Sequence, residues 1–156
     1  MEGTEKKVLL TIKGKQTDPE GNVQENLSVY EAVCREPVQE SLSEFEAACR
    51  EFFYQEEDQA ARLYVSRSIV VMERAGGTRM VFDPSVPVTK CLYRTPYGTI
   101  PMEIRTRRIA VLFGSGSNQR RHDACGGLRA RVAYLLTMEG DILLECEVTI
   151  RAGMAT

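Results

Sequence analysis

Two stretches of strand-forming residues meet at a single tetrapeptide, Thr95-Pro96-Tyr97-Gly98. Proline fixes one φ angle and glycine permits a positive φ, so this tetrapeptide predicts a tight turn. The stretches on either side, 88–93 and 99–113, are rich in β-branched and apolar residues, which favour strands. The segment therefore predicts two antiparallel strands joined by a short connection.

The same combination of alternating segments and turns recurs along most of the chain. Apolar and polar residues alternate within 7–15 and within 23–33, and the turn-forming stretch 17–22 separates the two. Further strands are predicted at 63–65, 69–72, 78–82, 128–138 and 141–151. About eight to ten successive antiparallel strands predict a mainly β fold, either a closed up-and-down barrel or a sandwich.

The last predicted hairpin, 128–151, has a charged face opposite its apolar one. Arg129 and Arg131 lie on the charged face of the first strand, and Glu145, Glu147 and Arg151 on that of the second. Opposite charges that face each other across neighbouring strands stabilise a sheet. We interpret these residues as cross-strand ion pairs on a solvated surface.

One segment departs from the period of two. Between 38 and 52 the apolar residues are spaced by three and four positions, at Val38, Leu42, Phe45, Cys49 and Phe52. Charged residues fill the positions between them. This spacing predicts one amphipathic helix near 38–52, which would pack its apolar stripe against the sheet.

The overall numbers limit the protein class. A chain of 156 residues is long enough for one domain with a real core, so we predict a single domain over 1–156. The net charge of −2 comes from 20 basic and 22 acidic residues. This balance argues against a general nucleic-acid binder, although it leaves room for a local basic patch.

Cysteine usage and hydropathy predict a cytoplasmic protein without a membrane partner. The five cysteines are odd in number and no two have the spacing of a Cys-x-x-Cys motif, which favours reduced thiols. The N-terminal residues do not contain the apolar stretch of a signal peptide. The longest apolar runs, such as 109–113, are too short to span a bilayer.

The residues offer little chemistry of their own. The single histidine, His122, lies three positions before Cys125 in the Gly- and Ser-flanked loop 114–127. A thiolate activated by His122, or anion capture by Arg120 and Arg121, is conceivable there, but a solvated loop is the favoured interpretation. No catalytic residue, metal site or cofactor is predicted, because no cluster of suitable ligands or bases is present.

Three segments resemble a known family. Lys7–Gly14, Met80–Phe82 and Leu92–Gly98 are similar to the YwiB-like family of uncharacterised bacterial proteins, and the resemblance extends from about 6 to 151. It implies a lipocalin-like (calycin) antiparallel β-barrel with no established activity. Family members run as strands through the region matching 34–54, so a strand at 52–57 with a helix confined to 38–50 is the alternative there.

The central turn supplies the candidate ligand-binding residues. Tyr93, Arg94 and Tyr97 flank it, and with Tyr134 they could hold an amphipathic or anionic ligand at the mouth of a barrel. The alternative is that the tyrosines only pack the barrel end. The leading prediction is a non-enzymatic barrel that binds a small hydrophobic or amphipathic molecule inside. A protein–protein interaction module or homodimer with a side-chain-filled barrel is the alternative, and an enzyme is the least favoured.

Overall fold

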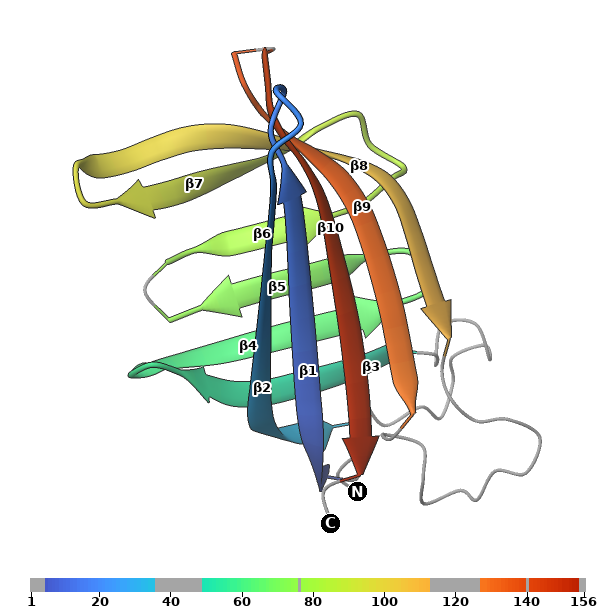
Figure 1. Cartoon of the computed structure of the whole chain (residues 1–156). Helices are drawn as coiled ribbons and strands as arrows, with labels where there is room; N and C mark the ends of the chain where they lie inside the picture. The colour runs from blue at the N-terminus through green and yellow to red at the C-terminus, as the bar shows by residue number, and fades with distance from the viewer. Residues whose placement is uncertain (1–4, 36–48, 76, 113–126, 140, 155–156) are drawn as a thin grey trace.

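The computed structural model describes residues 5–35, 49–75, 77–112, 127–139 and 141–154, and all of the regular structure there is antiparallel strand. The strands are β1 (Glu5–Thr17), β2 (Val23–Arg35), β3 (Cys49–Glu56), β4 (Gln59–Ser66), β5 (Val70–Arg74), β6 (Arg79–Phe82), β7 (Thr89–Thr95), β8 (Gly98–Leu112), β9 (Leu128–Met138) and β10 (Asp141–Met154). They form one sheet in the order β6-β5-β4-β3-β2-β1-β10-β9-β8-β7 (Figure 1).

The sheet curls on itself into a nearly closed barrel. The strands β1, β2 and β8–β10 form a first layer, and β3–β6 form a second layer that crosses behind it (Figure 1). The two layers enclose the core. The end strands β6 and β7 then meet without a backbone ladder between them among the described residues. Side-chain hydrogen bonds join them instead: the Thr89 hydroxyl donates to the Val81 carbonyl oxygen at 2.6 Å. The predicted antiparallel barrel is therefore confirmed at the level of strand number and direction.

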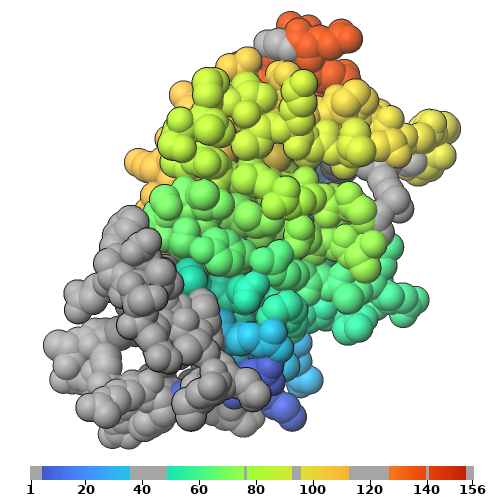
Figure 2. Space-filling model, turned by 180° about the vertical axis from the view of Figure 1, so that it is seen from behind, coloured from blue at the N-terminus to red at the C-terminus, as the bar shows by residue number. Residues whose placement is uncertain are grey.

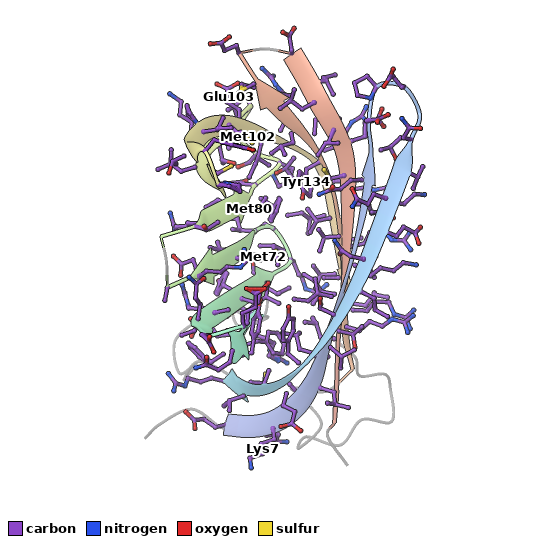
Figure 3. The ribbon with its side chains drawn as sticks, turned by 60° about the vertical axis from the view of Figure 1, so that its left-hand side comes forward. Lys7, Met72, Met80, Met102, Glu103 and Tyr134 are labelled. Carbon is purple, nitrogen blue, oxygen red and sulfur yellow. The ribbon has the colours of Figure 1, made fainter. Side chains whose placement is uncertain are left out.

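The core lies between the two layers. Alternate residues of each strand point inward, because side chains of a strand alternate between its faces, and the fully buried ones include Phe52, Leu63 and Phe82 from one layer and Leu10 and Ile150 from the other. Figure 3 shows Met72, Met80 and Tyr134 directed into this space. The four described cysteines, Cys34, Cys49, Cys91 and Cys146, are buried thiols that are not joined in disulfides.

The helix predicted near 38–52 is wrong at its C-terminal end. Residues 49–52 belong to the strand β3, whereas 36–48 lie outside the described residues. Phe52 and Tyr54 are buried while Phe53 between them is only half-buried, which is the period of a strand. Pairing of Phe52 with Leu63 on β4 overrides the local helical spacing. The alternative strand at 52–57 is confirmed up to Glu56.

Among the described strands, β2 has no neighbour along one edge from Val23 to Ala32, and it also has an exposed apolar face. It pairs with β1 along its whole length, but with β3 only from Val33 to Arg35. Leu27, which is 64% exposed, and Val29 lie on the outer side of the sheet. The inward side of β2 carries Ala32 and Cys34 where the two layers meet. The in-phase apolar residues of the 23–33 segment thus face away from the core.

Charged residues form a network on the outer face of the second layer. The Arg62 guanidinium binds Glu51 on β3 at 2.9 Å and also contacts Glu73 on β5. Arg79 on β6 donates to the second oxygen of Glu73 at 2.9 Å. Hydrogen bonds and charge from Arg62, and then from Arg79, hold the pKa of the Glu73 carboxyl below its usual value. The network ties β3 to β6 across four strands.

We expect Glu73→Gln to lower the free energy of unfolding by about 0.5–1 kcal/mol at pH 7, the range of partly exposed ion pairs. A carboxyl whose pKa is depressed by folding stabilises the protein above its unfolded value of about 4.3, and that contribution is lost as the pH falls through the folded pKa. The difference between the two proteins should therefore shrink as the pH is lowered from 7 to 3. Urea unfolding at both pH values measures it, and an undiminished difference at low pH would show that charge is not its cause.

Candidate functional site

The open seam between β6 and β7 contains a pocket of about 440 Å³. The two strands are joined by the turn 83–87 and splay apart beyond it, so the pocket opens between the start of β6 and the middle of β7. Its lining comes from the β5–β6 turn, from β6, β7 and β8, and from the β9–β10 turn: Gly77, Arg79, Lys90, Cys91, Leu92, Pro101, Met102, Glu103 and Glu139. Figure 2 shows the molecule from behind, with the colour passing from blue-green to yellow along β3–β7.

The pocket combines buried apolar groups with charged groups. Cys91 and Met102, which pair across the β7–β8 ladder, are both buried. Leu92 lies beside them and is 54% exposed. Burial raises the pKa of the Cys91 thiol, so that this group is neutral at pH 7 and contributes to the site as an apolar surface.

Charges of both signs surround these apolar groups. Arg79 and Lys90 supply cations, and Glu103 and Glu139 supply carboxylates. Lys90 lies directly opposite Glu103 in the β7–β8 ladder. Pockets of roughly 300–1,000 Å³ with an apolar lining and a few polar groups are typical of small-molecule sites. The seam pocket therefore suits a molecule with an apolar part and a polar or charged end.

The four predicted ligand-binding residues occupy three different environments. Tyr97 is at the tip of the β7–β8 hairpin and is 98% exposed. Tyr134 is buried on β9, where its ring centroid lies 4.7 Å from that of Phe82. Tyr93 and Arg94 continue β7 directly beyond Leu92 of the pocket. The structure thus does not bring Tyr97 and Tyr134 together.

The sequence interpretation missed most of the pocket. Arg79, Lys90, Met102 and Glu139 come from four separate segments, and no local spacing connects them. The loop 114–127, with His122 and Cys125, lies outside the described residues except for Gly127. Within the described ranges, no three His, Cys, Asp or Glu side chains are placed to hold a metal ion. No helix among those residues is long and apolar enough to cross a membrane.

Comparison with known proteins assigns the chain to a family. The family model described as a domain of unknown function, DUF1934, matches residues 50–150. The chain belongs to the DUF1934 family. The crystal structure of the YwiB protein from Bacillus subtilis is similar, with a TM-score of 0.69 and 16% sequence identity, and the match covers 98% of this chain and 96% of that one. The predicted YwiB-like resemblance is confirmed.

The DUF1934 match contains the whole seam pocket, because the pocket residues fall between 77 and 139. At 16% identity, the similarity to YwiB concerns the fold alone. No curated protein matches the sequence. The comparisons therefore supply a fold and a family without an activity, and a function has to be argued from the geometry.

Proposed function

We propose that this DUF1934 protein is a non-enzymatic, lipocalin-like barrel that binds a small amphipathic molecule in the seam between β6 and β7. The observation that carries the proposal is the pocket of about 440 Å³, in which Met102 and Cys91 form an apolar surface beside charged side chains. An apolar tail would cover Met102 and Leu92. A polar or anionic head would lie near Arg79 and Lys90.

The proposed site differs in position from the one predicted at a barrel mouth. The space between the layers holds a continuous cluster of buried side chains, including Phe52, Leu63, Phe82 and Ile150. The open seam gives a ligand access without displacing that core. Tyr93, Arg94, Tyr97 and Tyr134 remain predictions as ligand-binding residues, as does a cytoplasmic location.

The test uses two matched substitutions on exposed leucines. Leu92→Asp places a carboxylate in the pocket, whereas Leu27→Asp places one on the outer face of β2, away from the pocket. Dodecanoate, an amphipathic probe, should raise the melting temperature of the wild type and of Leu27→Asp, because only the folded state binds it. Leu92→Asp should weaken dodecanoate binding by at least about 10-fold, since burying an unpaired charge opposes binding.

Native mass spectrometry of the freshly purified wild type complements that test. An added mass that is lost on denaturation would support a bound small molecule and begin its identification. A bare dimer would instead support the interaction module, for which the free edge of β2 from Val23 to Ala32 is the favourable observation. Equal effects of Leu92→Asp and Leu27→Asp on dodecanoate binding would refute the seam as the site.

A further inference from the structure

The outer face of the first layer concentrates positive charge. Four neighbouring strands, β8, β9, β10 and β1, present eight exposed basic side chains there: Lys13, Lys15, Arg105, Arg107, Arg108, Arg129, Arg131 and Arg151. We call these eight residues the basic face. The described residues of the same four strands also include five acids, which are Glu5, Glu103, Asp141, Glu145 and Glu147. The whole chain nevertheless has a net charge of −2.

The register of the described strands places carboxylates directly opposite Lys15, which faces Glu147 on β10 and Glu25 on β2, and opposite none of the other seven cations. Arg129 lies directly opposite Arg151 in the β9–β10 ladder. Arg131 is 4.0 Å from the Glu147 carboxylate, a long and solvent-exposed ion pair. The interpretation of 128–151 as a set of cross-strand pairs is thus confirmed for one pair and wrong for Arg129 and Arg151. Like charges directly opposite each other destabilise a sheet, so packing and folding do not account for this arrangement.

A β-bulge adds to the basic face. The register between β8 and β9 shifts between Thr106 and Arg108. The extra residue lets the successive residues Arg107 and Arg108 both be exposed, although neighbours on a regular strand point to opposite faces. Bulges commonly re-aim side chains in this way. Next to the bulge, a hollow of about 200 Å³ is lined by Arg107 and Lys15 and also by Glu145 and Glu147, so it contains charges of both signs.

The geometry points to a double-stranded nucleic acid: we propose that the basic face binds the phosphate backbone of a duplex without reading its sequence. Six of the eight cations are arginines, whose planar guanidinium groups match phosphate oxygens. The cations of β8 and those of β1 are three strand spacings apart, about 14 Å. That span is close to the width of a B-DNA major groove, about 12 Å, so the two sets can contact the phosphates on either side of a groove.

Two other anionic partners fit less well. Single strands bind on exposed aromatic side chains, and the described residues of the basic face include none that are exposed. A membrane surface would favour a continuous apolar surface among the cations. On the described residues of these four strands, three large apolar side chains are exposed, Leu9, Leu112 and Ile142, against eight cations. Leu27 and Val29 lie beyond β1 on β2, next to Glu25 and Glu31, which would repel anionic lipid.

The test measures anisotropy of labelled 20-base-pair DNA and RNA duplexes, with a 20-nucleotide single strand and phosphatidylserine vesicles as competing partners. We expect duplex binding at 50 mM salt that weakens steeply as salt increases, because phosphate contacts release counterions. Arg129→Gln/Arg151→Gln should weaken duplex binding by about 10-fold and reduce the salt slope by about 2. The melting temperature of this double variant should be equal to or above that of the wild type, because a like-charge pair is removed.

The matched control is Arg35→Gln/Arg74→Gln, which removes the same charge from β2 and β5, where both arginines have acidic partners. It should leave duplex binding within about two-fold of the wild type, because both arginines lie outside the basic face and salt screens exposed charges that are distant from the phosphates. Equal losses in the two double variants would overturn the proposal, as would the absence of duplex binding at 50 mM salt. Tighter binding to the single strand or to the vesicles than to either duplex would also overturn it.

Discussion

Replacement of Phe82 by alanine is expected to lower the free energy of unfolding by about 3–5 kcal/mol, the range for large aromatic residues in a core. Phe82 is fully buried on β6, and its ring lies 4.7 Å from that of Tyr134 on β9. It therefore joins the two layers close to the open seam. Because β6 has no backbone ladder to β7 among the described residues, side-chain packing has to hold this end of the sheet.

Tyr134→Phe is the matched control for this prediction. It keeps the ring against Phe82 and removes only the hydroxyl, which is hydrogen-bonded to the Cys146 thiol. We expect a loss of about 1 kcal/mol from that substitution, as for a single hydrogen bond. Urea unfolding of the three proteins gives both values. A loss below about 1.5 kcal/mol for Phe82→Ala would mean that the seam end of the barrel contributes little to stability.

Proline at Thr149 is expected to cost about 3 kcal/mol or more, or to prevent folding. Thr149 is in the middle of β10, which has β1 on one side and β9 on the other. Proline lacks an N–H group, and because both sides of β10 are paired, its absence breaks a ladder whichever side that N–H faces. Circular dichroism and urea unfolding of Thr149→Pro measure the loss.

The free edge of β2 provides the comparison. Ser28 and Val29 pair only with β1, and neighbouring residues of a strand direct their N–H groups to opposite sides. At least one of Ser28→Pro and Val29→Pro should therefore cost less than half as much as Thr149→Pro, because it removes an N–H that bonds to no described strand. If both are as damaging as Thr149→Pro, the edge of β2 is occupied in solution.

The strands and turns of this protein are determined by local sequence. Alternating residues predicted nearly every described strand, and the Thr95–Gly98 turn forms with Gly98 at a φ of 131°, a value that suits glycine. The alternation also identifies which residues share a face. Strand formation and side-chain parity depend on neighbouring residues, which is why a single sequence contains them.

The burial of each strand face and the pairing of each strand depend on the tertiary structure. Leu27 and Val29 share a parity that local reasoning assigns to a core, yet they lie on the outer side of the sheet, opposite to Ala32 and Cys34, and they remain exposed. Residues 49–52 follow a helical spacing and still form a strand, because β4 pairs with them.

The candidate sites depend on tertiary structure in the same way. The seam pocket draws on five separate segments between 77 and 139. The basic face does not appear in a net charge of −2, since a net charge is a sum over the whole surface. Local patterns in the sequence predicted nearly all of the described strands, the turns and the family resemblance. The pairing of distant strands decided the pocket, the free edge and the location of the charges, because these depend on contacts that no local pattern encodes.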